Sequence, residues 1–193
     1  MQRLRDSDTA ELMRSWFGLS ASEVATQIGI PASTMKAHLA GVYRKVTPIE
    51  VEKAILELGI RLATQVALLT DAPHRADYLR VSGDSVTPLR RPELAKPGTG
   101  TGFPLAEHPF LTEIVARREP VAGVLGARRL GPHARRMADH LGIRAGAGVP
   151  VIRGTTVHGI LSIASSGPQP SRELVRRLAD VGRMLEVALA NRP

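Results

Sequence analysis

The sequence has no cysteine, and this absence removes several kinds of chemistry. Disulfides, thiolate metal sites, a cysteine nucleophile and thioether-linked cofactors all require that residue. Aromatic residues are also scarce, at 3% of the 193 residues. Binding of single-stranded nucleic acid by stacking needs several exposed rings, so this composition disfavours such a site. A core must instead be built from the aliphatic residues that dominate the 43% hydrophobic fraction.

Long apolar runs are missing as well. The N-terminus runs through residues 1–6 into a charged segment and lacks the apolar stretch of a signal peptide. No window approaches the roughly 20 uninterrupted apolar residues of a spanning helix. We therefore expect a soluble, cytoplasmic protein that does not associate with a membrane.

The whole chain has a net charge of +8. Most of this positive charge lies in its C-terminal part. Residues 1–70 hold eight Lys/Arg and seven Asp/Glu, which gives +1, whereas residues 71–193 hold eighteen and eleven, which gives +7. A basic excess can attract phosphate or an anionic ligand. A solvated, arginine-rich surface is the simpler interpretation of the same excess.

A long helix is predicted over residues 48–70, because proline suits its first position and apolar residues recur at steps of four and three. The seam residues are Val51, Ile55, Leu58, Leu62, Gln65 and Leu69. Further apolar residues on other faces indicate burial on more than one side. The helix could pack on its own domain and on a partner subunit, or be an ordinary core helix. Gly59 could divide it in two.

The C-terminal part predicts a mixed α+β domain. Strand-like runs cover residues 76–81, 148–152 and 156–164, and the last two predict a hairpin around Arg153-Gly154. Strands and helices do not alternate regularly, which favours a largely antiparallel sheet with helices on its faces. A closing helix over 171–190 follows. Residues 88–102, rich in Pro, Gly and Thr, predict a long loop that could act as a lid.

The N-terminal part predicts a helix-turn-helix within residues 4–46. Ser20 can cap a helix, with Glu23 three residues on as a capping box. Gly29 then permits a turn, and a second helix runs from Pro31 to about Val46. This is the arrangement by which a second helix exposes its N-terminal half to the major groove.

Residues 4–55 resemble the DNA-binding domains of the LuxR/NarL family, through LSASEVA at 19–25 and IPASTMKAHLAGVYRKV at 30–46. The resemblance implies base contacts from Lys36, Ala37 and Ala40, since lysine can donate to guanine and alanine can touch a thymine methyl. It implies phosphate contacts from four further residues. These are Ser33, Thr34, Arg44 and Lys45. We expect His38 to be structural, holding its helix against its neighbours.

Residues 49–190 resemble a GAF domain, through the segments 76–81 and 103–110, VPVIRG at 149–154 and VHGILSIA at 157–164. The resemblance implies a noncovalent small-molecule effector, haem, or no ligand. The asparagine-containing motif of cyclic-nucleotide-binding GAF domains cannot be formed, because Asn191 is the only asparagine. The candidate ligand-binding residues are Tyr78, His108, Phe110, Met137 and His140. No complete ligand set for a metal appears.

Together these patterns predict an α+β protein with an all-α helix-turn-helix domain, 1–48, joined by a long helix to an antiparallel-sheet GAF-like domain, 49–193. The expected function is that of a transcription regulator, a homodimer that binds double-stranded DNA and responds to a small molecule. No catalytic residues or cofactors are assigned, and no enzyme is expected. One alternative is an IclR-like regulator, although 44–48 leaves no room for its β-wing. Another is a GAF signalling adaptor that binds protein.

Overall fold

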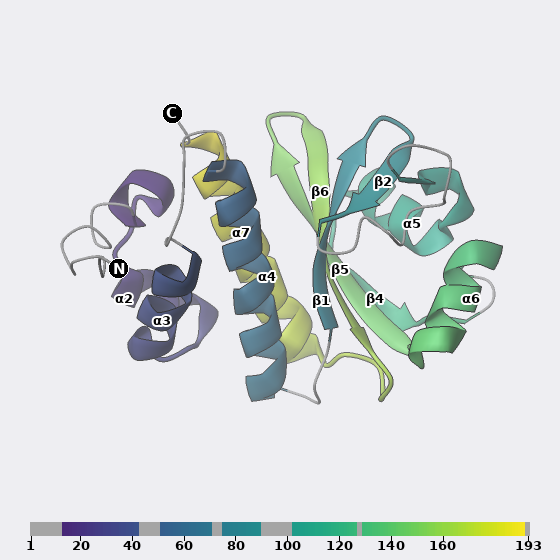
Figure 1. The fold of residues 1–193 in the computed structure, drawn as a ribbon, viewed down its shortest axis with the longest axis horizontal. Helices are drawn as coiled ribbons and strands as arrows, with labels where there is room; N and C mark the ends of the chain where they lie inside the picture. The colour runs from purple at the N-terminus through teal and green to yellow at the C-terminus, as the bar shows by residue number, and fades with distance from the viewer. Residues whose placement is uncertain (1–12, 43–50, 71–74, 90–101, 127–128, 192–193) are drawn as a thin grey trace.

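The computed structural model describes residues 13–42, 51–70, 75–89, 102–126 and 129–191. Four layers follow one another across the molecule (Figure 1). They are the N-terminal helices, the helix pair α4 and α7, an antiparallel sheet, and the helices α5 and α6. The predicted domain boundary at residue 48 and most of the predicted lid lie outside the described residues.

The sheet has six strands in the order β3-β2-β1-β6-β5-β4, and every described pairing is antiparallel. The strands are β1 (Arg75–Ser82), β2 (Ser85–Pro88), β3 (Phe103–Pro104), β4 (Val121–Val124), β5 (Ala145–Arg153) and β6 (Thr156–Ser165). Gly154 has a φ of 60° in the tight turn between β5 and β6, a conformation that glycine adopts without strain. The predicted antiparallel sheet and its hairpin are confirmed.

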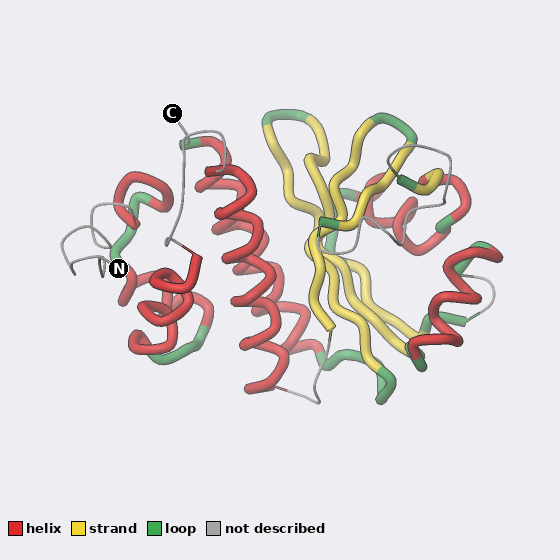
Figure 2. The backbone as a smooth tube through the Cα atoms, viewed as in Figure 1, coloured by secondary structure: helices red, strands yellow, loops and turns green. Residues whose placement is uncertain are grey.

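Helices α4 (Val51–Thr70) and α7 (Arg172–Ala190) cover one face of the sheet (Figure 2). Helix α4 is continuous, so Gly59 does not divide it. A Cβ at Gly59 would lie 2.6 Å from Cδ1 of Leu185, so the missing side chain is what lets α4 and α7 pack this closely. We call this side of the sheet the packed face.

The opposite side, here called the cavity face, carries η4 (Leu105–Glu107), α5 (Pro109–Arg117) and α6 (Pro132–Leu141). Its core is a separate and smaller cluster. The buried members are Val86, Phe103, Phe110, Leu111, Ile114, Val121 and Ile160. The two faces therefore differ in how completely side chains fill them.

The N-terminal helices α2 (Ala21–Ile28) and α3 (Ala32–Val42) form as the sequence predicts. The Ser20 hydroxyl accepts a hydrogen bond from the Glu23 N–H at 3.2 Å, and the Glu23 carboxylate accepts one from the Ser20 N–H at 2.7 Å. This reciprocal pair is the predicted capping box. Gly29 ends α2 with a φ of 73° and turns the chain toward α3.

These helices lie against the outer side of α4 and α7, with α3 on α4 and α2 on α7. The Arg177 guanidinium donates to the Gly29 carbonyl at 3.2 Å, and the Asn191 amide donates to the Trp16 carbonyl at 3.3 Å. Trp16 is 3% exposed and belongs to the same buried cluster as the α4 and α7 side chains. One continuous core thus extends from the N-terminal helices to the sheet.

The apolar seam predicted as a subunit interface lies inside this core. Ile55, Leu58 and Leu62 are each fully buried within the single chain. Sheet and N-terminal helices cover α4 from two sides, so this part of the seam is not a free surface for a second copy. Within the chain, α4 therefore packs as an ordinary core helix. A homodimer stays a prediction, and its two subunits would have to meet through another surface.

Among the described helices, none combines the length and the apolar character needed to cross a membrane.

Candidate ligand cavity and N-terminal helix face

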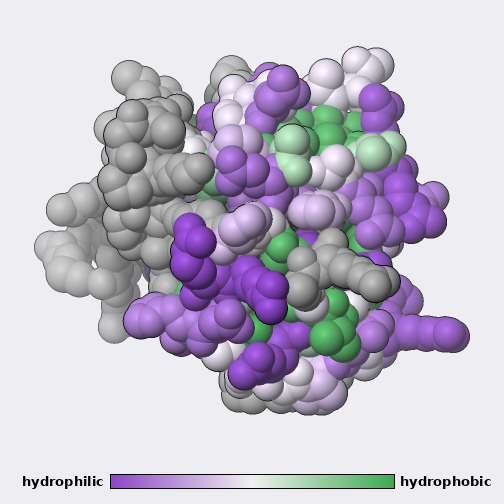
Figure 3. All heavy atoms as spheres, turned by 90° about the vertical axis from the view of Figure 1, so that its right-hand side faces the viewer, coloured by the Kyte–Doolittle hydropathy of each residue, from purple (hydrophilic) through white to green (hydrophobic). Residues whose placement is uncertain are grey.

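A cavity of about 410 Å³ lies between the cavity face of the sheet and helices α5 and α6. Most of its lining is apolar. Leu79, Pro88, Phe103, Phe110, Leu111, Leu125, Leu130, Ala138, Leu141 and Ile143 contribute to it. Figure 3 shows this side of the molecule, where apolar surface is bordered by hydrophilic side chains. Volume and lining match those of sites that hold a small organic molecule.

Polar side chains from strands β1 and β6 enter the cavity wall side by side. Asp77 and Ser162 are partners in the strand register, and both line the cavity. The Ser162 hydroxyl donates to the Asp77 carbonyl at 3.2 Å. Arg75, two residues before Asp77, also lines the cavity. Thr64 on α4 contributes as well, so the lining reaches the packed side of the sheet at this point. A few polar groups in an apolar wall are the usual means of orienting a bound molecule.

A ring cluster forms another part of the wall. His108, 3% exposed, lies at the start of α5 with its ring centroid 4.3 Å from that of Phe103. The Arg129 guanidinium lies 5.9 Å from the centroid of the Phe110 ring and 3.5 Å from the Glu113 carboxylate. The cation and the ion pair hold the Phe110 side of the wall in place.

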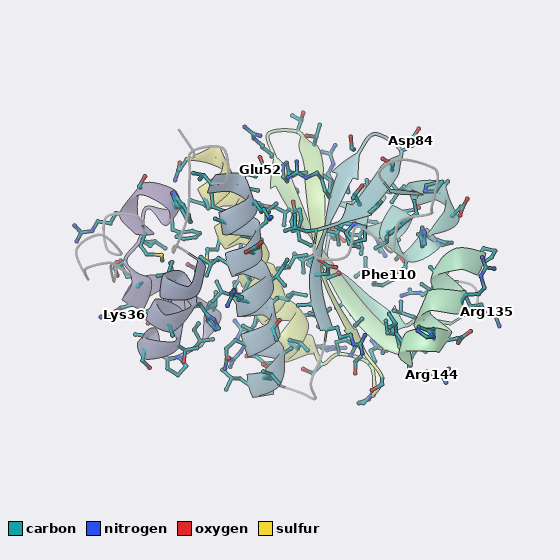
Figure 4. All side chains as sticks on the ribbon, viewed as in Figure 1. Lys36, Glu52, Asp84, Phe110, Arg135 and Arg144 are labelled. Carbon is teal, nitrogen blue, oxygen red and sulfur yellow. The ribbon has the colours of Figure 1, made fainter. Side chains whose placement is uncertain are left out.

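Two of the five predicted ligand-binding residues, His108 and Phe110, line this cavity. Phe110 is labelled in Figure 4. Tyr78 does not, because its ring is fully buried on the packed face. His140 is exposed on α6 and is not part of the lining. Met137 lies in α6, but its side chain is outside the described residues. Tyr78 thus lies on the face of its strand opposite the cavity, and the ligand-binding roles themselves stay predictions.

The sequence prediction missed Asp77 and Ser162. Successive residues of a strand point to opposite faces, so a pattern that brings Tyr78 to one face brings Asp77 to the other. Both residues lie in runs that are predicted to be strands. The alternation of side chains along a strand can be read from the sequence, but it does not show which face of the sheet holds the cavity.

Tyr78 belongs instead to a polar network on the packed face. Its hydroxyl lies 2.6 Å from Nδ1 of His158. Nε2 of His158 lies 3.6 Å from the carboxylate of Glu52, which also pairs with Arg80. Burial raises the pKa of Tyr78 far above its usual value, so the phenol is neutral and keeps its hydrogen.

No three described His, Cys, Asp or Glu side chains come together as a metal site would require.

The N-terminal half of α3 presents an exposed face. Ser33, Lys36 and Ala37 are exposed, and Thr34 is half-buried. Lys36 projects away from the rest of the molecule (Figure 4). Of the remaining predicted DNA contacts, the Ala40 side chain, Arg44 and Lys45 lie outside the described residues.

His38 is half-buried and is near Arg61 of α4. Among the described side chains, His38 Nε2 and Arg61 Nε are buried polar atoms with no hydrogen-bond partner in the protein. Burial, and then the charge of Arg61, lower the pKa of His38. This placement agrees with the expected structural role between the helices.

No protein-family model matches the sequence, and no curated protein matches it significantly. Solved structures do match. The GAF domain of a phosphoenolpyruvate-protein phosphotransferase from Coxiella burnetii is 16% identical and has a TM-score of 0.53, with 88% of this chain and 94% of that chain covered. The fold is that of a GAF domain. This fold provides the predicted antiparallel sheet with helices on both faces.

Two further structures share the GAF fold at low identity. The GAF domain of a two-component sensor histidine kinase from Bacillus halodurans has a TM-score of 0.53 at 14% identity, covering 70% of this chain and 94% of that one. A GAF domain/HD domain protein from Geobacter sulfurreducens has a TM-score of 0.52 at 15% identity, covering 74% and 95%. At such identities the likeness shows the fold alone. The resemblance of residues 4–55 to LuxR/NarL domains receives no support from these structures.

Proposed function

We propose that this protein is a GAF-type sensory protein that binds a small, largely apolar organic molecule between its sheet and helices α5 and α6. The observation that carries the proposal is the cavity of about 410 Å³ with its apolar lining and few polar groups. A void of that size forfeits packing contacts, and a ligand that fills it restores them. The relative from Bacillus halodurans, a sensor histidine kinase, supports a role in sensing. The proposed activity is binding and not catalysis.

The test is saturable binding of the fluorescent dye anilinonaphthalene sulfonate to the folded protein. Ala138 lines the cavity from α6, and Ala138→Phe places a ring inside it. Ala116→Phe on α5, an exposed position outside the lining, is the matched control. We expect the cavity variant to weaken dye binding by about tenfold or more, because its ring occupies the binding volume, and the control to match wild type. Equal binding by both variants, or no saturable binding at all, contradicts the proposal.

We further propose that the N-terminal helices are the output of the sensor and bind double-stranded DNA. The capped helix α2, the left-handed turn at Gly29 and the exposed Ser33, Lys36 and Ala37 on α3 favour this output. The Ala40 side chain, Arg44 and Lys45 stay predicted DNA contacts outside the described residues. The alternative is an adaptor in which these helices bind protein. The solved structures, which match GAF domains of signalling proteins and give no support to a DNA-binding domain, favour this alternative.

Selection from randomised duplex DNA across a salt series distinguishes the two outputs. We expect an enriched sequence whose binding falls steeply with salt, since phosphate contacts release counterions. Lys36→Glu should abolish the enrichment, whereas Lys53→Glu, a charge reversal at an exposed position of α4, should retain it. Folded protein that enriches no sequence, with both variants alike, favours the adaptor.

A further inference from the structure

The packed face of the sheet carries a polar network that no ligand reaches directly. The Tyr78 hydroxyl on β1 lies 2.6 Å from Nδ1 of His158 on β6. Nε2 of His158 lies 3.6 Å from the carboxylate of Glu52, in the first turn of α4. Arg80, again on β1, pairs with the same carboxylate. Three elements, β1, β6 and α4, therefore meet through polar side chains on this face.

A β-bulge aims His158 into this network. The register pairs Val151 with Gly159 and Ile152 with Val157, so His158 is the extra residue of β6. Bulges redirect side chains at the point where one strand has an extra residue. At the same place the Ile152 N–H donates to the carboxylate of Glu186 on α7 at 2.8 Å.

The Tyr78 hydroxyl fits only because β6 has a glycine beneath it. A Cβ at Gly159 would lie 2.3 Å from the Tyr78 hydroxyl oxygen. Burying a hydroxyl is costly unless it is hydrogen-bonded, and His158 provides that bond. The glycine and the bulge together fix the contact between the two side chains.

The backbone of β1 connects the cavity wall to this network. The Asp77 carboxylate accepts a hydrogen bond from the Tyr78 N–H at 2.7 Å, and the Ser162 hydroxyl donates to the Asp77 carbonyl at 3.2 Å. Asp77 and Ser162 both line the cavity. A ligand that contacts either side chain therefore acts on the peptide group that carries Tyr78.

Beyond the network lies the helix that supports α3. Glu52 lies at the end of α4 where the helix starts, and α4 packs against α3 (Figure 4). Tyr78, His158 and Glu52 form a continuous series of contacts from β1 to the first turn of α4. The exposed face of α3 is therefore one helix away from this network.

We propose that Tyr78, His158 and Glu52 are positioning residues that couple occupancy of the cavity to α4 and, through it, to α3. This inference rests on the proposed function of the cavity as a ligand site. None of the three residues lines the cavity, so they act on the response to a ligand and not on its binding.

Hydrogen exchange of the backbone amides in 51–60 and 32–42, with and without anilinonaphthalene sulfonate, tests the coupling. In wild type we expect the dye to change exchange rates there by about threefold or more. Tyr78→Phe and His158→Gln should lose that change while dye affinity stays within about twofold of wild type. Glu119→Gln is the control, because Glu119 is exposed after α5, outside both the network and the cavity lining.

The outcomes separate the coupling from the proposed function. Dye binding that is blocked by Ala138→Phe but leaves 51–60 unchanged in wild type overturns the coupling and leaves the ligand site intact. Variants that keep the wild-type response overturn it as well. If the wild-type protein shows no saturable dye binding, the proposed ligand site itself is overturned. If Tyr78→Phe does not fold, then His158→Gln and Glu52→Gln, at side chains 15% and 16% exposed, make the same test.

Discussion

The two faces of one sheet are built in opposite ways. On the packed face, α7 buries a full stripe that includes Leu174, Leu178 and Leu185, and Gly59 lets α4 approach it closely. On the cavity face, α6 buries only Ala138 among its described side chains, and about 410 Å³ remains open. Because both helix layers rest on the same strands, the difference lies in the helices. Complete packing gives one side rigidity, and incomplete packing leaves the other side able to respond to a ligand.

Truncation of one leucine on each face should give the largest contrast. Leu185→Ala on the packed face should lower the free energy of unfolding by about 2–5 kcal/mol, because a tight site relaxes little around a new void. Leu141→Ala on the cavity face should cost less, since Leu141 is half-buried and already borders open space. Urea denaturation measures both. Equal losses would mean that the two faces are packed alike.

Addition of bulk should reverse the order of the two faces. Gly59→Leu forces a side chain against Leu185 and should cost about 1–3 kcal/mol. Ala138→Leu extends into the cavity and should leave the melting temperature unchanged or raise it. Thermal unfolding of the two variants beside wild type decides the matter. A clear loss of stability in Ala138→Leu would show that the cavity has no room for a leucine side chain at this position.

The junction between the N-terminal helices and α7 extends the packed side and should contribute a smaller amount. Arg177→Gln removes the hydrogen bond to the Gly29 carbonyl and should lower the free energy of unfolding by about 0.5–1.5 kcal/mol. Arg172→Gln, an exposed position on the same helix, is the control and should be neutral. The rate of amide hydrogen exchange within 21–28 should rise in Arg177→Gln and stay unchanged in Arg172→Gln. A rise in both variants would mean that the loss of a positive charge, and not of the hydrogen bond, is the cause.

The pH dependence of the α3–α4 contact is expected to be the smallest effect. The pKa of His38 is lowered in the folded protein, chiefly by burial. As the pH falls below the unfolded value of about 6.5, the unfolded chain takes up a proton first, so the folded state loses stability. That loss continues down to the lower folded pKa and is absent at high pH. Urea denaturation between those two pH values should show that the free energy of unfolding depends less steeply on pH in His38→Gln than in wild type. An unchanged slope would exclude His38 as a source of the pH dependence.

The sequence predicted the elements well where the pattern is local. Ser20 with Glu23 marked the start of α2, and Gly154 marked the hairpin turn. These features depend on a few neighbouring residues, whose hydrogen bonds and conformational limits act wherever the segment lies.

Features that depend on tertiary placement were beyond the sequence. The heptad seam through Leu58 is apolar whether a partner subunit or the N-terminal helices cover it. Tyr78 and Asp77 lie on opposite faces by alternation, but only the assembled layers show which face is hollow. The bulge at His158 shifts the strand period by one residue, and no local pattern marks that shift.

Trp16 gives the protein an optical reporter of its own. It is the only tryptophan, it is 3% exposed, and its carbonyl receives the bond from Asn191 at the end of α7. Trp16 therefore lies where the N-terminal helices meet the end of α7. Separation of the two would shift the emission to longer wavelength, so release of the N-terminal helices can be followed in solution without a label.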